Sequence, residues 1–483
     1  MIAERPLSML AAPALAVSLL LGFGISLITV AWPVPGLLLG MSLCGLLSVV
    51  RWPSLLLLGF VVSLALPVQR TLAGLPLNTA DGIVLLWCLL LPGLLLRRNA
   101  RLHLPVLVKA VLPFVLAVAL AQATSIAWQG SLKQLLRIVE WFVVLPLLLL
   151  VFTPDPRFWR FVAVLLLVVP SLFALDGLIE WARDGQRLTE MLGIGVPVPD
   201  GDQAQIRHTF DISGRAGSTF GGAQGLAMFL VMTMSVSIAH LLRAATVWLR
   251  RLAGVSLLIS LAGLAATQSR GGLLGAVTVA TVMLLMLKPA WRAPLLWLAT
   301  LTVVAGVMVL GFLPGWDGSL SGLVPGRQAA VQDRLILWGV VWQVFAEHPL
   351  LGVGLGNFRD AFFAHPVALN VELGYPSLHA HNTFLEILAG TGALGLLAYL
   401  WFLWSVGRAL LRRWSPADPG EANLFTLAAI GTLSAYLVFA MVDMLLLQNM
   451  HFLLVLLLSL GLLQQAEASD GLARTSTAEG GSP

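Results

Sequence analysis

The strongest constraint in this sequence is a series of apolar runs, each close to the length needed to cross a lipid bilayer. A transmembrane helix needs about 20 consecutive apolar residues. Of the 483 residues, 58% are hydrophobic and only 11% are charged. Soluble domains carry roughly 25% charged residues, so this chain lacks the polar side chains needed to cover a surface in water. We therefore expect an all-α integral membrane protein.

The apolar runs predict a bundle of about 12 to 14 transmembrane helices, because several early runs are short for a full crossing. They lie near residues 8–31, 35–50, 53–68, 82–96, 105–127, 138–153, 159–181, 221–242, 251–267, 272–288, 293–313, 382–407, 423–444 and 447–463. Two long connecting segments, 182–220 and 314–381, interrupt the series.

The basic residues predict the orientation of the bundle. They cluster in six short loops that all fall on one side: Arg51; Arg97, Arg98 and Arg101; Arg157 and Arg160; Arg243, Arg250 and Arg251; Lys288 and Arg292; Arg408, Arg412 and Arg413. By the positive-inside rule this side is the cytoplasm, so both long segments face the periplasm of a bacterial inner membrane. This distribution also gives no indication of nucleic acid as a partner.

Four regions follow along the chain. We expect N-terminal transmembrane helices over 1–204, a core with the periplasmic loop 314–381 over 205–407, and C-terminal transmembrane helices over 408–463. Residues 464–483 are rich in Ala, Ser, Thr, Gly and Glu, a composition typical of a disordered tail.

One helix is predicted inside the long loop 314–381. Five apolar residues share a stripe at helical spacing: Val331, Leu335, Trp338, Trp342 and Phe345. An amphipathic helix of this kind lies along a membrane surface or caps the bundle. Arg334 sits at the edge of the stripe, where it could point back toward the bundle.

Two arginines on the periplasmic side are candidate anion ligands. Arg215 lies among glycines just before an apolar run, where backbone amides and a helix N-terminus favour an anion. A flexible loop with an arginine reaching to the interface is the alternative. Arg270 occupies a short turn between two spans, on the side where arginine is disfavoured. Its partner is either an anionic ligand or a structural acid.

A polar segment opens the span that follows the long loop. His381 can act as a general base near neutral pH, and Asn382 can cap the helix. Glu386 shares a face with Asn382 but points away from His381 on a regular helix, so it reaches the site only if the helix is irregular or the contact runs through Asn382. His379 and His381 could alternatively form a metal pair.

Two further patterns are weak. The glycines of 352–356 lack the strand and helix of a nucleotide-binding motif, and residues 200–202 (Asp-Gly-Asp) are more typical of a turn than of a metal-nucleotide site.

Residues 205–407 resemble the O-antigen ligase and O-antigen polymerase superfamily. His381-Asn382, followed after nine residues by the Gly-x-x-Gly of 392–395, resembles its signature. The turn 269–272 (Ser-Arg-Gly-Gly) resembles its short turn between two spans. The run from Arg334 through Trp338 to residue 358 resembles its large periplasmic loop.

The resemblance implies a glycosyltransferase that needs neither a metal nor another cofactor. Its donor would be a glycan on undecaprenyl diphosphate, and its acceptor a hydroxyl of lipid A–core, of another lipid-linked glycan or, less often, of a protein. The diphosphate would be bound by Arg215, Arg270 and Arg334. His381 would be the general base, oriented by Asn382 and Glu386.

Two alternatives stay open. A polysaccharide polymerase of the same superfamily shares the donor and the signature. A transporter or flippase would suit the number of spans, although the sequence lacks the repeated halves typical of many transporters.

Overall fold

The computed structural model describes residues 54–65, 69–72, 75–96, 104–150, 156–186, 191, 214–220, 222–287, 328–365, 378–442 and 450–463. The expected spans near 8–31, 35–50 and 293–313, the tail 464–483 and the Asp-Gly-Asp turn at 200–202 lie outside these residues.

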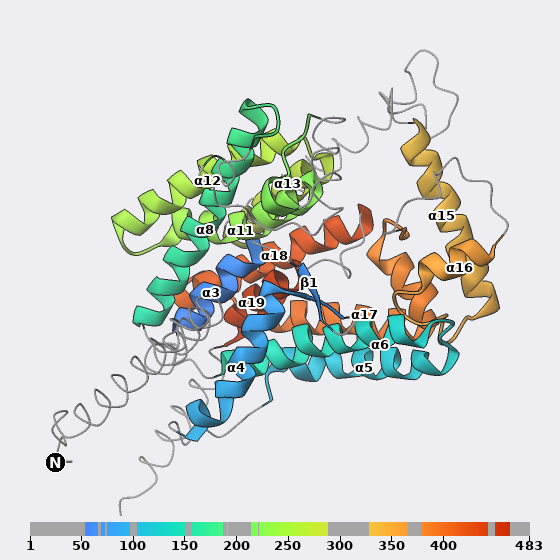
Figure 1. The fold of residues 1–483 in the computed structure, drawn as a ribbon. Coiled ribbons are helices and arrows are strands. Elements are labelled where there is room, and N and C mark those ends of the chain that lie inside the picture. Colours follow the sequence, from blue (N-terminus) through green and yellow to red (C-terminus); the bar gives the residue numbers. More distant parts are fainter. Residues whose placement is uncertain are drawn as a thin grey trace, which may run out of the picture.

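Within the described residues the fold is helical, apart from a β-hairpin of β1 (Gln69–Leu72) and β2 (Leu75–Asn78) (Figure 1). The helices are α3 (Ser54–Ala65), α4 (Thr79–Leu96), α5 (Val106–Leu120), η1 (Ala121–Thr124), α6 (Trp128–Val139), the π-helical η2 (Glu140–Val144), α7 (Leu145–Leu149), α8 (Pro156–Ala182), η3 (Ser218–Phe220), α11 (Ala223–Arg243), α12 (Val247–Thr267), α13 (Arg270–Leu287), α15 (Gln328–Glu347), α16 (Phe358–Ala364), α17 (Thr383–Arg413), α18 (Glu421–Val442) and α19 (Met450–Leu462).

The expected all-α membrane architecture is confirmed. Each predicted apolar run that falls in the described part of the chain coincides with a helix. Seven of the described helices are long and apolar enough to cross a membrane: α5 with η1, α8, α11, α12, α13, α17 and α18.

The basic helix ends meet at one end of the bundle, which we call the basic end. The guanidinium of Arg243, at the end of α11, lies 5.8 Å from the ring of Trp414, which follows α17. The His240 ring of α11 pairs with the Glu421 carboxylate at the start of α18, with a nitrogen–oxygen distance of 3.2 Å. The C-terminal ends of α11 and α17 and the N-terminal end of α18 therefore meet on one side, as the arginine clusters at these helix ends predict.

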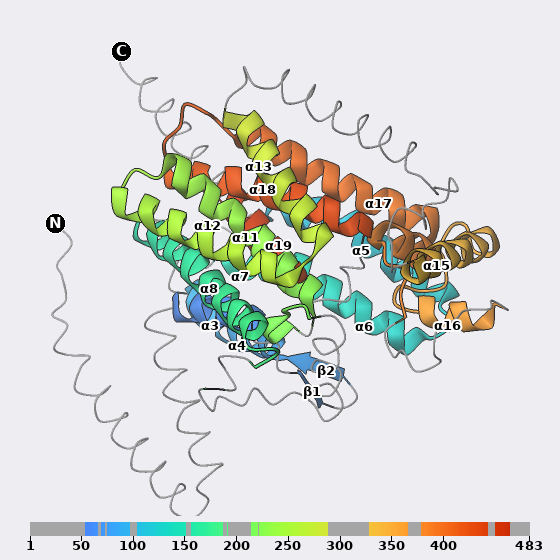
Figure 2. The same cartoon turned by 90° about the horizontal axis from the view of Figure 1, so that it is seen from above.

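The other ends of the same helices form the opposite end of the bundle. A Cβ added to Gly275 of α13 would lie 2.9 Å from the Phe439 ring of α18, and one on Gly431 would lie 3.0 Å from the Met283 sulfur. The helices α13 and α18, which lie side by side in Figure 2, are thus antiparallel, so α13 begins at Arg270 at the end of the bundle where α18 ends.

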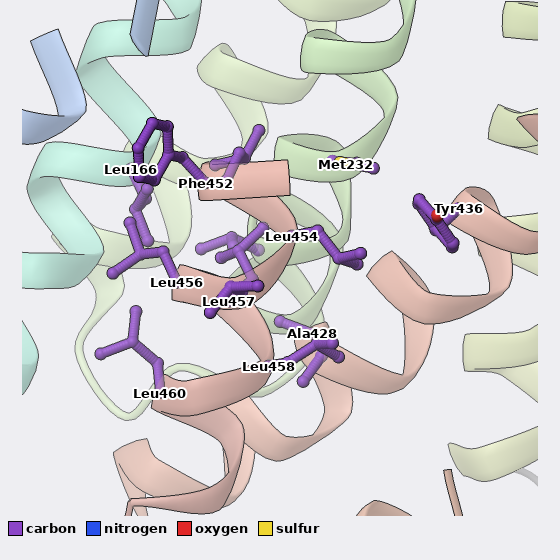
Figure 3. Packing of buried hydrophobic residues seen from close by; sticks show 14 of the residues in the cluster. Leu166, Met232, Ala428, Tyr436, Phe452, Leu454, Leu456, Leu457, Leu458 and Leu460 are labelled. Carbon is purple, nitrogen blue, oxygen red and sulfur yellow. The ribbon is translucent and has the colours of Figure 1, made fainter. Parts of the chain in front are cut away.

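The main hydrophobic core lies between α8, α11, α17, α18 and α19. The short helix α19 is buried along its described length, and its leucines pack against Leu166 of α8, Met232 of α11 and Ala428 of α18 (Figure 3). A helix that is apolar on every side and surrounded by other helices is stabilised by its neighbours rather than by one amphipathic face.

A second hydrophobic core lies beside the bundle. It joins α15, α16, the glycine loop 350–357 and the first turns of α17. The buried face of α15 consists of Leu337, Val340, Val341 and Val344. The predicted helix is therefore confirmed. Of its predicted apolar stripe, Trp338 and Phe345 pack against the second core, whereas Leu335 and Trp342 are exposed. Since α15 is apolar around most of its circumference, spacing alone did not distinguish the packed face.

The helix α17 is broken at Gly392, whose φ of 62° and ψ of −164° are non-helical. The rings of Phe384 and Tyr399 lie 6.2 Å apart, on either side of the break. In a straight helix, 15 residues would separate them by about 22 Å along the axis. The first turns of α17 are therefore sharply bent relative to the rest.

Candidate active site

The loop that carries Arg215 is held against the end of α12. The Arg215 Nε donates a hydrogen bond to the Thr267 carbonyl at 2.9 Å. The amide of Ala216 donates to the Ala266 carbonyl at 3.1 Å. The half-buried Arg215 side chain is thereby fixed at the turn that leads to Arg270. Two arginine segments that are far apart in the sequence therefore share one end of the bundle.

Only two residues, Gln268 and Ser269, separate the end of α12 from the start of α13. Gln268 has a φ of 48°, the left-handed conformation that commonly ends a helix. The Ser269 hydroxyl accepts a hydrogen bond from the Gly272 amide at 3.1 Å and so caps α13. Arg270 begins α13 and is exposed. The expected short turn is thus confirmed.

The histidine segment precedes α17 in a strained conformation. The rings of His379 and His381 lie 4.2 Å apart, and His381 has a φ of 48°, a conformation that non-glycine residues rarely adopt. The Asn382 side chain caps α17 by accepting the amides of Phe384 and Leu385 at 2.9 and 3.1 Å. The expected cap at Asn382 is confirmed.

The same asparagine ties this segment to the bundle. Its Nδ2 donates to the carbonyl of Met441, near the end of α18, at 3.1 Å. Since Arg270 lies beside this end of α18, the histidine segment and the two arginine segments occupy the same end of the bundle.

Glu386 reaches the histidine segment through the main chain. Its buried Oε2 accepts the amide of Ala380 at 2.9 Å. The link to the histidine segment therefore runs through Ala380, whereas the sequence predicted either an irregular helix or a contact through Asn382. Glu386 can reach Ala380 because residues 378–382 turn back over the first turn of α17. A prediction that treats these residues as part of a regular helix does not include this contact.

The helix α15 covers this segment from outside the bundle. The indole nitrogen of Trp338 donates to the Ala380 carbonyl at 2.9 Å. Arg334 lies one turn earlier on α15 and is half-buried. The third candidate arginine is thus carried by the helix that contacts the histidine segment.

The glycine loop 350–357 and the Gly-x-x-Gly segment 392–395 lie next to each other in the structure. The amides of Val353 and Gly354 donate to the carbonyls of Ala389 and Gly390, at 3.0 and 2.9 Å. Across the break at Gly392, the amide of Ala393 donates to the Pro349 carbonyl at 2.8 Å. The glycine loop therefore satisfies the backbone groups that the broken helix leaves without helical partners. Its observed contacts are with α17 on both sides of the break.

Sequence reasoning did not assign a role to two acids at the end of α8. Glu180 accepts the amides of Gly217 and Ser218 at 2.9 and 2.6 Å, and Asp176 accepts the Ser218 hydroxyl at 2.6 Å. The amides expected to approach an anionic ligand are thus engaged by Glu180. Two carboxylates one helical turn apart in an otherwise apolar helix were the available signal.

The fold and the site define a polytopic membrane protein with arginine and histidine segments gathered at one end of its bundle. Residues 255–400 match the protein family described as O-antigen ligase, and this match supports the predicted superfamily. Members of this family are glycosyltransferase-like ligases and polymerases. The matched range contains Arg270, Arg334 and His381, whereas Arg215 precedes it. No curated protein matches the chain.

Proposed function

We propose that this protein transfers a glycan from undecaprenyl diphosphate to an acceptor hydroxyl, with lipid A–core as the acceptor. One observation supports the assignment most directly. Within or next to an O-antigen ligase domain, cationic groups and a histidine occupy the same end of a membrane bundle. A lipid diphosphate needs the cations, and an attacking alcohol needs the base.

The arginines would stabilise the leaving group. As the glycosidic bond breaks, negative charge develops on the diphosphate. One guanidinium group can donate two parallel hydrogen bonds to two phosphate oxygens. A guanidinium that is already held in place loses little entropy on binding. The hydrogen bond from Arg215 to Thr267 provides such preorganisation. Arg270 and Arg334 are proposed as the further diphosphate ligands.

His381 would remove the proton from the attacking hydroxyl, a step worth roughly 10²–10⁴-fold in rate. Asn382 and Glu386 would orient it, the first by capping α17 and the second by holding Ala380. A single displacement on an α-linked donor inverts the anomeric carbon. The bond from sugar to diphosphate supplies the driving force, so the reaction requires no ATP. The arginines would stabilise the leaving diphosphate in place of a metal.

The side of the membrane follows from charge. With the basic end in the cytoplasm, Arg215, Arg270 and His381 open toward the periplasm of the inner membrane. A lipid-linked donor would enter from the outer leaflet of that membrane.

The test is transfer by purified protein, with undecaprenyl-diphosphate-linked glycan as donor and lipid A–core as acceptor. We expect transfer by the wild type in the presence of EDTA. Transfer should be lost in His381→Ala and strongly reduced in Arg270→Lys, which cannot form the paired contact. Wild-type rates in His381→Ala would refute the general-base role. Loss of activity in EDTA with recovery on adding a divalent cation would refute the metal-free mechanism.

The choice of acceptor separates the two activities of the superfamily. Elongation of a second lipid-linked glycan, with no transfer to lipid A–core, would identify a polymerase. Transfer to neither acceptor would refute the proposal.

A further inference from the structure

We propose that Glu180 is a positioning residue that holds Arg215 in the geometry needed to bind the donor diphosphate. This inference rests on the proposed function, in which Arg215 is a diphosphate ligand. Glu180 lies on α8 and is separated from the Arg215 loop by more than 30 residues of sequence, since its bond to Gly217 spans 37 positions.

Both acids of the pair are buried. Glu180 is 2% exposed and Asp176 is 3% exposed. A carboxylate buried at the end of a membrane helix is costly unless hydrogen bonds compensate for its lost hydration. Glu180 receives two consecutive amides, and Asp176 receives a hydroxyl from the same loop. The hydrogen bonds that satisfy the acids therefore also fix the loop.

The loop adopts a conformation that requires such fixing. Ser218 has a φ of 48°, which a residue with a side chain adopts only where its surroundings impose it. Its amide and its hydroxyl both point to α8, where Glu180 and Asp176 accept them. Without these acceptors the turn would relax toward an ordinary backbone conformation, and Arg215 would move with it.

Arg215 is therefore held from two sides. Toward α12, its own Nε and the amide of the next residue, Ala216, are bound to carbonyls. Toward α8, the two residues after Ala216 are bound to Glu180. Removing the contacts to α8 leaves the hydrogen bonds to α12, so the guanidinium is fixed less tightly. We expect weaker donor binding and no change in acceptor binding.

The experiment compares variants of the full-length protein in detergent. The dissociation constant for undecaprenyl diphosphate and the KM for each substrate are measured for the wild type, Glu180→Gln, Arg215→Ala and the double variant. Glu180→Gln keeps an acceptor oxygen but loses the charge. We expect its dissociation constant and donor KM to rise roughly tenfold, the change typical of weakening a charge-assisted hydrogen bond, with an unchanged acceptor KM.

The double variant distinguishes positioning from general stabilisation. If Glu180 acts through Arg215, the double variant binds undecaprenyl diphosphate as weakly as Arg215→Ala alone. Multiplied effects would overturn the inference. Glu421→Gln, which changes an acid bonded to His240 at the basic end, is the matched control and should bind like the wild type.

The remaining outcomes are equally distinct. Wild-type binding by Glu180→Gln, with weakened binding by Arg215→Ala, would overturn this inference and leave the proposed function intact. Wild-type binding by Arg215→Ala would remove Arg215 from the proposed diphosphate site, and the inference with it. If Glu180→Gln does not fold, Asp176→Asn loosens the same loop through Ser218 and takes its place with the same expectations.

Discussion

The break in α17 offers the sharpest test of how this site is built, through the substitution Gly392→Ala. With a φ of 62° and a ψ of −164°, Gly392 occupies a region that is almost closed to other residues. Forcing alanine into it costs about 1–3 kcal/mol. The new Cβ would also overlap the carbonyl group of Leu350, and overpacking of this kind costs about 1–3 kcal/mol more. We therefore expect a loss of about 2–6 kcal/mol in the free energy of unfolding.

The measurement is the apparent Tm of purified protein in detergent at a fixed scan rate. Unfolding of membrane proteins is often irreversible, so only variants measured in the same way are compared. Gly339→Ala is the matched control. Gly339 lies within α15, and an added Cβ would meet nothing within 4 Å. Alanine should there raise helix stability by about 0.5–1 kcal/mol.

Gly392→Ala should also abolish transfer, because the break aligns the first turns of α17 with the glycine loop and so sets the position of His381. A wild-type Tm for Gly392→Ala would refute this reasoning, since the conformation would then not require glycine. A lowered Tm with normal transfer would show that the break stabilises the protein without positioning the histidine.

Two further substitutions probe the support of the histidine segment. Asn382→Ser keeps a capping oxygen for α17 but loses the bond to the Met441 carbonyl, so we expect a near-normal Tm with transfer reduced several-fold. Asn382→Ala, which also loses the cap, should cost about 1 kcal/mol more in unfolding free energy. Wild-type transfer by Asn382→Ser would disprove a role for the bond to Met441. Trp338→Phe removes the donor to Ala380 and should cost about 1 kcal/mol with a measurable drop in transfer rate, whereas Trp342→Phe, at a position 56% exposed, should behave like the wild type in both assays.

Much of the architecture could be predicted because the bilayer imposes a length and a polarity on each span. The apolar runs located the described helices, and the arginine clusters identified the helix ends that meet at Arg243 and Glu421. The capping role of Asn382 was also readable, since it depends on residues only two and three positions away.

The long-range part of the site could not be predicted. The bond from Arg215 to Thr267 spans 52 positions, and the one from Gly217 to Glu180 spans 37. No local pattern specifies such pairs, because they depend on how whole helices pack. The glycines of 352–356 carry no clear functional signal in the sequence for the same reason. Their hydrogen bonds are made to the break in α17, which is far away in the sequence.

Through the second core, α15 can influence the position of the histidine segment relative to the main bundle. The first turns of α17 form a shared wall, with Ile387 packed toward the bundle and Leu388 toward α15. Arg215 is hydrogen-bonded to α12 on the bundle side of that wall, whereas Trp338 donates a hydrogen bond to the histidine segment from the other side. Exchanging a valine of α15 for a larger or smaller side chain would thus shift His381 relative to Arg215, so residues outside the main hydrophobic core can adjust the proposed active site.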